Sequence, residues 1–142
     1  MPRVIAARML LPGKTAGEIV RLEPLSFWGG FDAATGRVDE PSHPQFGQVL
    51  TDRILVMPTG RGSSSSSSVI AESIRARTAP AAFVLREVDA IIATGVMVAA
   101  ELYGTRIPVV VVGADLWDEL TTGNWLTIDA DGEDATLTFD VD

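Results

Sequence analysis

Short apolar runs alternate with amphipathic stretches between residues 54 and 112, and this order constrains the fold more than any other feature of the chain. Three continuous apolar runs have the length of strands that are buried on both faces: 54–57, 81–85 and 108–112. Two amphipathic stretches lie between them: 66–77 and 89–103. The pattern predicts a parallel β-α-β-α-β unit with right-handed crossovers, and therefore an α/β fold class.

The two amphipathic stretches carry the signals expected of helices. Apolar side chains three or four positions apart form one stripe on each: Val69, Ile70 and Ile74 on the first, and Ile92, Val96, Ala99 and Tyr103 on the second. Asp89 stands where the N-cap of the second helix is expected, and Gly104 stands just past its end.

The flanking regions are predicted to be strands and turns. Residues 4–11 and 17–22 have strand character and are separated by a predicted turn, Pro12-Gly13-Lys14. Residues 125–129 and 135–141 form a predicted hairpin around Asp131-Gly132-Glu133, inside a solvated acidic tail. The chain has 142 residues, 46% of them hydrophobic, so we expect one domain, 1–142, with a single compact core.

Composition excludes several classes of function. Nineteen acidic residues against eleven basic ones give a net charge of −8, which argues against a nucleic-acid partner. No run approaches the roughly 18 apolar residues of a membrane span, and the start of the chain lacks a secretory pattern, so we expect a cytoplasmic protein. The sequence has no cysteine and one histidine, His43. We therefore predict no metal site on this chain, because thiolate and histidine clusters cannot form.

A run of six serines, Ser63 to Ser68, follows the buried strand at 54–57. Serine-rich tracts are typical of flexible linkers, but this one joins a strand to a helix inside a β-α-β unit, where connections are short. Capping a helix needs only two or three serines, so capping does not explain the length of the run. The preceding Gly60-Arg61-Gly62 frees the backbone to turn, and open N–H groups at a helix start favour a carboxylate or phosphate.

Two known phosphate-binding motifs do not fit this loop. A dinucleotide fingerprint needs a third glycine where Ser65 stands, and a Walker loop needs a Gly-Lys pair that is absent.

Several strings resemble the small, swivelling subunit of the aconitase X family over roughly residues 5–112. These strings are LVMPTGRGS at 55–63, TAPAA at 78–82, ELYG at 101–104, IPVVV at 107–111, and LSFWGG at 25–30 with Asp32 and Gly36. The resemblance implies a swivelling β/β/α domain like the last domain of aconitase.

The resemblance also implies a function and a partner. It implies a dehydratase that works as a heterodimer or higher assembly with a large subunit, which holds a cysteine-ligated iron–sulfur cluster. Bacterial members act on cis-3-hydroxy-L-proline to give a pyrroline-2-carboxylate, and archaeal members act on mevalonate 5-phosphate. The unbroken serine run favours the bacterial type, because the archaeal pattern mixes other residues after the first serine.

By the same resemblance, Ser63 is the expected catalytic base. A serine hydroxyl serves as a base only if amides, a helix dipole or a cation stabilise its alkoxide. The backbone N–H groups expected to donate hydrogen bonds to the alkoxide and the substrate are those of Gly62, Ser64 and Ser65. Arg61 is expected to bind a substrate carboxylate through its guanidinium group. Alternatively, Ser63 or Ser64 only caps the helix, and Arg61 is a solvated loop residue or a salt-bridge partner at an interface.

Four other residues have a structural and a functional interpretation. In the functional interpretation, the site or the subunit contact is lined by Ser26, Trp28 and Gly30. In the structural interpretation, which we favour for two of them, Trp28 packs in the core and Gly30 serves the geometry of a turn. His43 is expected at the surface rather than in catalysis.

Two rival classes of function are distinguishable by simple observations. A stand-alone small-anion-binding module would bind its ligand without a partner. A phosphohistidine carrier domain needs a histidine in the loop at 58–68, and that loop has none.

Overall fold

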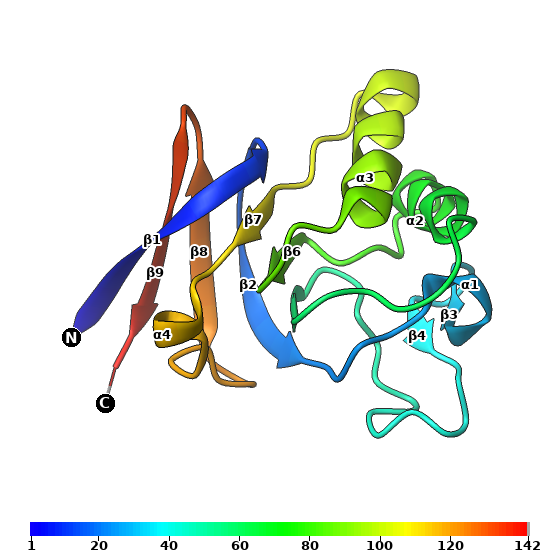
Figure 1. Ribbon diagram of the computed structural model, residues 1–142, viewed down its shortest axis with the longest axis horizontal. Coiled ribbons are helices and arrows are strands. Elements are labelled where there is room, and N and C mark those ends of the chain that lie inside the picture. The colour runs from blue at the N-terminus through cyan, green and yellow to red at the C-terminus, as the bar shows by residue number, and fades with distance from the viewer. Residues whose placement is uncertain (142) are drawn as a thin grey trace.

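Seven strands close into a barrel in the computed structural model, which describes residues 1–141 (Figure 1). Their order around the barrel is β1-β7-β6-β5-β2-β8-β9, and β9 pairs with β1 to close it. The strands are β1 (Pro2–Leu11), β2 (Gly13–Arg21), β5 (Ile54–Met57), β6 (Ala82–Leu85), β7 (Val109–Val111), β8 (Trp125–Ala130) and β9 (Asp134–Asp140). A separate two-stranded ribbon joins β3 (Phe31–Asp32) to β4 (Arg37–Val38).

Most of the helical structure lies on one side of the barrel, next to the parallel strands, whereas the short helix after β7 lies apart from it (Figure 1). The two main ones are α2 (Ser66–Arg75) and α3 (Ala90–Tyr103), which follow β5 and β6. A single turn, α1 (Phe27–Gly30), contacts α2, and α4 (Ala114–Trp117) follows β7. Strands β5, β6 and β7 pair in parallel, so the predicted β-α-β-α-β unit at 54–112 is confirmed. The predicted hairpin is also confirmed, since β8 and β9 pair antiparallel; Asp142 of the predicted acidic tail lies outside the described residues.

Burial on both faces explains the continuous apolar runs. Along β5, Leu55 and Met57 pack with the helices, whereas Ile54 and Val56 pack with residues from all seven strands inside the barrel. The expectation of a single core is therefore wrong, because the parallel strands separate two apolar clusters. None of the helices within residues 1–141 has the length and apolar character that crossing a bilayer requires.

The predicted turn Pro12-Gly13-Lys14 is wrong in extent. Strand β2 begins at Gly13, so only Pro12 separates it from β1, and the two strands pair with other neighbours. A Cβ atom at Gly13 would stand 2.7 Å from Cδ of Pro108, so the glycine permits a close approach that a sequence pattern does not reveal.

The apolar stripe of α3 ends one turn earlier than predicted. Ile92, Val96 and Ala99 are buried, but Tyr103 is exposed at the rim of a pocket near the end of α2. Helix α2 itself ends at Arg75 because Arg77 adopts a left-handed conformation with φ of 63°.

The close approach of α2 and α3 depends on Gly95. A Cβ there would lie 2.7 Å from the carbonyl oxygen of Ser67 and 3.0 Å from Cβ of Ile70. We predict that Gly95→Ala lowers the free energy of unfolding by about 1–3 kcal/mol through overpacking, although alanine is the better helix former.

Urea unfolding followed by circular dichroism measures this effect. The control is Thr94→Ala at the adjacent exposed position, which we expect to change stability by less than about 0.5 kcal/mol. A Gly95→Ala protein as stable as the parent would contradict the proposed contact.

Candidate functional site

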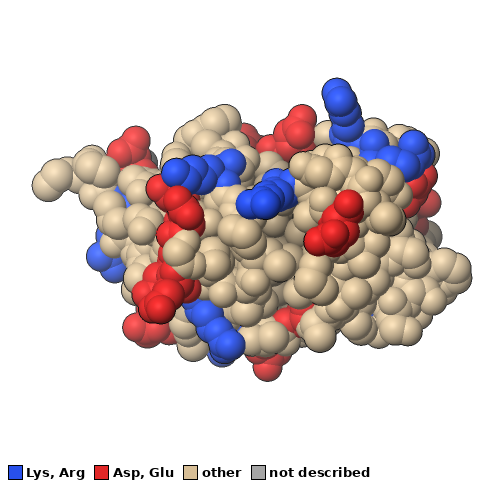
Figure 2. Space-filling view, turned by 90° about the horizontal axis from the view of Figure 1, so that it is seen from above, with Lys and Arg blue, Asp and Glu red and all other residues tan. Residues whose placement is uncertain are grey.

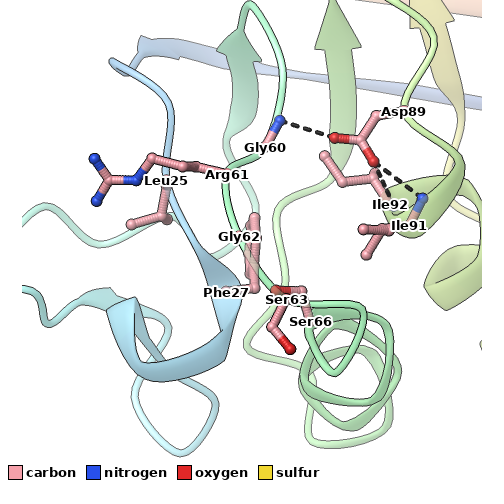
Figure 3. A pocket seen from close by; sticks show the side chains of 10 residues that line it. All are labelled: Leu25, Phe27, Gly60, Arg61, Gly62, Ser63, Ser66, Asp89, Ile91 and Ile92. Carbon is pink, nitrogen blue, oxygen red and sulfur yellow. Dashed lines mark hydrogen bonds between the residues drawn. The ribbon is translucent and has the colours of Figure 1, made fainter.

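The carboxyl ends of β5 and β6 lie side by side, because these strands pair in parallel from Ile54↔Ala82 to Met57↔Leu85. The chain leaving β5 forms the loop 58–65 and enters α2, and the chain leaving β6 reaches Asp89 and enters α3. A small pocket lies between these two connections, with Gly60, Gly62 and Ser63 on one wall and Asp89 on the other (Figure 3). The crevice expected at this sheet edge is therefore present.

The Asp89 carboxylate joins the two connections. Its Oδ1 accepts hydrogen bonds from the amides of Ile91 at 3.0 Å and Ile92 at 3.1 Å, which confirms the predicted N-cap of α3. Its Oδ2 accepts from the amide of Gly60 at 2.9 Å and from Oγ1 of Thr59 at 3.1 Å (Figure 3 draws the bond to Gly60). Sequence analysis missed this second role, because only the parallel pairing of β5 and β6 brings the two loops together.

Ser63 places its hydroxyl oxygen beside open backbone amides. Its Oγ accepts a hydrogen bond from the amide of Ser65 at 3.0 Å. Within residues 1–141, the amides of Gly62, Ser63 and Ser64 have no hydrogen-bond acceptor, and Gly62 has a φ of 97° that turns the chain sharply. An amide donating to Oγ stabilises the ionised form of the hydroxyl, and the free amides favour a further anion. The same bond also closes the turn that leads into α2, so a capping role uses the same geometry.

The later serines of the run hold the site to its surroundings. Oγ of Ser66 accepts from the amide of Trp28 at 3.1 Å, and Oγ of Ser67 donates to the carbonyl of Ile91 at 2.7 Å. Ser68 donates within the first turn of α2. Hydrogen bonds to α1 and α3 therefore explain why the run is longer than helix capping needs.

Arg61 is held by an ion pair outside the pocket. Its Nη2 lies 2.8 Å and 3.1 Å from the two carboxylate oxygens of Glu40, and its side chain points away from Ser63 (Figure 3). Its backbone amide donates to the carbonyl of Leu25 at 3.1 Å and anchors the loop. The ion pair lies within the chain, so it is neither the solvated residue nor the interface salt bridge considered from the sequence, and a substrate carboxylate would have to compete with Glu40 for this guanidinium.

Two structural expectations near the site are wrong. The Trp28 side chain is 59% exposed instead of packed in the core, and the chain departs from helical geometry at this residue and at Gly29, which has a φ of 82°. His43 is buried instead of lying at the surface. Its Nδ1 accepts from the amide of Gln45 at 3.0 Å, and its Nε2 lies 2.9 Å from the carbonyl oxygen of Glu23. Both ring nitrogens of His43 are therefore used in fixing the loop.

The turn interpretation of the glycines after Trp28 agrees with the structure. Gly30 is buried, and a Cβ on it would lie 3.1 Å from a methyl group of Leu25. Ser26 bonds locally, since its Oγ donates to the carbonyl of Trp28 at 2.9 Å.

The pocket beside Ser63 is too small to enclose a metabolite. Its cavity volume is about 40 Å³, whereas pockets for small molecules span roughly 300–1,000 Å³. Among residues 1–141, no group of three or more His, Cys, Asp or Glu side chains could hold a metal ion. The chain therefore presents one wall of a site, with a serine hydroxyl and open amides on it.

We predict that Asp89→Asn releases the loop from the sheet edge. The amide oxygen of asparagine can still cap α3, but its NH2 group cannot accept from Gly60, so stability should fall by about 1–3 kcal/mol. Urea unfolding measures the loss, and hydrogen exchange of the Gly60 amide should accelerate. Glu87→Gln, a change at an exposed carboxylate nearby, is the matched control. Unchanged exchange at Gly60 in Asp89→Asn would contradict the role of this carboxylate.

Comparisons with known proteins agree on one family. The family model "Aconitase X swivel domain" matches residues 4–137. The cis-3-hydroxy-L-proline dehydratase of Pseudomonas aeruginosa is 42% identical over 91% of this chain but only 22% of its own length. The phosphomevalonate dehydratase small subunit of Thermococcus kodakarensis is 36% identical over 96% of this chain and 97% of its own.

The structural match extends the family assignment to the fold. The crystal structure of aconitase X from Thermococcus kodakaraensis superposes with a TM-score of 0.82 at 34% identity, covering 95% of this chain and 98% of that one. The predicted swivelling α/β fold is therefore confirmed. The chain spans about a fifth of the length of the hydroxyproline dehydratases it matches, so what those whole proteins do does not transfer directly. On the family match and this superposition together, the chain belongs to the aconitase X swivel-domain family.

Proposed function

We propose that this chain is the small subunit of a dehydratase that converts cis-3-hydroxy-L-proline into a pyrroline-2-carboxylate. The observation that carries the proposal is the hydroxyl of Ser63, set in a partial pocket with the amide of Ser65 on its oxygen. The identity to the Pseudomonas aeruginosa cis-3-hydroxy-L-proline dehydratase supports this choice of substrate.

Ser63 is the proposed base. Removal of water next to a carboxylate requires that the proton on the α-carbon be taken away and that a hydroxide leave from the adjacent carbon. In this proposal the alkoxide of Ser63 takes the α-proton, and the amide of Ser65 and the N-terminal end of α2 stabilise the alkoxide before the transfer. The open amides of Gly62 and Ser64 are the proposed contacts for the substrate carboxylate, which would also draw Arg61 away from Glu40.

A large partner subunit completes the site in this proposal. The small pocket leaves most of a proline-sized ligand uncovered, and relatives of similar length are named small subunits. The chain has no cysteine and therefore cannot ligate an iron–sulfur cluster through thiolates of its own. We assign the cluster to the partner, where it would supply the Lewis acid for the departing hydroxide.

Mevalonate 5-phosphate is the second candidate substrate. Phosphomevalonate dehydratase small subunits match this chain over nearly their whole length, at 36% and 38% identity in two Thermococcus species. Assays of the assembled enzyme with both compounds distinguish the two substrates.

We predict that Ser63→Ala in the assembled enzyme lowers kcat by about 10²–10⁴-fold, the range expected when a general base is lost. Measurement of kcat on cis-3-hydroxy-L-proline tests it. The control is Ser68→Ala, which removes an exposed hydroxyl from the same run and should retain activity. Full activity of Ser63→Ala would leave helix capping as the role of this serine.

The exposed Trp28 is the proposed anchor for the large subunit. Large aromatic side chains at the centre of an interface are frequent hot spots, and Trp28 is tied through its amide to Ser66 beside the site. We predict that Trp28→Ala weakens association with the large subunit by about 30-fold or more, and that it leaves folding intact because the ring is exposed.

Titration calorimetry under anaerobic conditions measures that affinity. The matched control is Trp125→Ala, because Trp125 is similarly exposed, at 63%, but lies on β8, which stands apart from α1, α2 and α3 (Figure 1). Equal effects of the two substitutions would show that the partner does not dock over Trp28.

A further inference from the structure

A second and larger pocket lies at the opposite end of the parallel strands from Ser63. It is lined by Asp52, which precedes β5, and by 79–81, which precede β6, together with the C-terminal ends of α2 and α3. Its cavity volume is about 570 Å³, within the roughly 300–1,000 Å³ typical of small-molecule sites. The dehydratase proposal makes no use of this pocket.

The backbone around this pocket is strained where it presents Arg77. At the end of helix α2, the amide of Thr78 donates a hydrogen bond to the carbonyl of Ser73 at 2.9 Å. In this type of helix end, the residue before the donor adopts a left-handed conformation and is normally glycine. Arg77 occupies this position with a φ of 63°. Within residues 1–141, the only other non-glycine residue with positive φ is Asp52, and it lines the same pocket.

An arginine in the left-handed conformation destabilises the helix end, so the presence of Arg77 at this position points to a role for its side chain. A Cβ in that region clashes with the backbone, so glycine there would make a more stable helix end than arginine does. Residues that adopt a strained backbone conformation are frequently functional. Here the strained residue places a guanidinium group at the wall of the pocket.

Two of the three arginines that line the pocket form no ion pair in the part of the chain that the structure describes. Arg75 is bound by Glu72, with nitrogen–oxygen distances of 2.6 Å and 2.7 Å, and these hydrogen bonds lower the pKa of the Glu72 carboxyl. Within residues 1–141, neither Arg77 nor Arg106 has a carboxylate oxygen within 4.0 Å. Figure 2 looks onto the end of the molecule where α3 ends, and it shows Lys and Arg side chains interspersed with Asp and Glu on this face.

One carboxylate, that of Asp52, also belongs to the lining, whereas the other polar groups of the pocket suit an anion with several oxygens. The hydroxyl groups of Tyr103, Thr105 and Thr15 belong to residues of the lining, and guanidinium groups match phosphate geometry with paired N–H donors. We propose that this pocket binds a small phosphate-bearing anion, with Arg77 and Arg106 contacting the phosphoryl oxygens. Because it stands at the far end of the strands from Ser63, it is a site separate from the proposed dehydration site and does not depend on that proposal.

Heteronuclear NMR of the full chain, labelled with ¹⁵N, tests the proposal. The chain is titrated at constant ionic strength with inorganic phosphate and, separately, with glycerol phosphate as a phosphate monoester. We expect saturable shifts of the amides near residues 52, 77–81 and 105–107. Tighter binding of one probe identifies whether free phosphate or a monoester is the preferred ligand.

Three variants make the test specific. Arg77→Gly removes a guanidinium and also relieves the left-handed strain, so the variant keeps its fold and should bind about tenfold more weakly or worse. Arg106→Gln should weaken binding similarly. Arg8→Gln removes the same charge from an exposed position on β1 and should change affinity by less than about twofold.

Three results would overturn the proposal. The first is the absence of saturable shifts with either probe. The second is an equal loss of affinity in all three variants, which would show only an effect of net charge. The third is a set of shifts confined to residues 60–66, which would place the phosphate on the open amides beside Ser63.

Discussion

The geometry of the candidate site depends on one carboxylate that is shared between two loops. Asp89 caps α3 with one oxygen and holds the amide of Gly60 with the other, so the start of one helix fixes the loop that leads into its neighbour. Parallel pairing of β5 and β6 brings these two connections together, and the bond from Ser67 to Ile91 ties the two helices at the same end. Ser63 is positioned at the end of this chain of contacts. A hydroxyl that must act as a base needs such fixed donors, because stabilisation of an alkoxide depends on amides that are already in place.

The candidate site around Ser63 is fixed in geometry but incomplete, which suits a swivelling domain that works with a partner. The chain presents a small pocket, open amides and an exposed tryptophan on the helical side of the barrel. The barrel and the helices form two apolar clusters that share strands β5 to β7, so this surface is supported from both sides. A partner subunit of the kind proposed above would therefore meet a surface whose geometry is fixed within this chain. The relatives differ in length, since the phosphomevalonate dehydratase small subunits are about as long as this chain, whereas the cis-3-hydroxy-L-proline dehydratases are several times longer.

Sequence reasoning predicted the features that depend on local pattern. The parallel unit at 54–112, the cap by Asp89 and the acidic hairpin each follow from periodicity or turn chemistry within a short window, and the structure confirms them. The family resemblance singled out Ser63, and the structure puts its oxygen within hydrogen-bond distance of the Ser65 amide. Two of the features that were missed require two distant segments to meet. The bond between Asp89 and Gly60 spans 29 positions, and the burial of His43 depends on the carbonyl of Glu23, 20 positions earlier. The exposure of Trp28 was missed for a different reason, because an aromatic residue in an apolar string does not show which way its side chain faces.

The most direct test of the account is whether dehydration requires this chain and its large partner together. The partner is recovered by an anaerobic pull-down with this chain as bait, and the water-removal assay is run on each subunit alone and on the mixture. The account predicts turnover of cis-3-hydroxy-L-proline only in the mixture, because Ser63 lies on one chain and the rest of the site on the other. Turnover by the large subunit alone, or isolation of this chain as a stable monomer that binds a small anion without any partner, would contradict it.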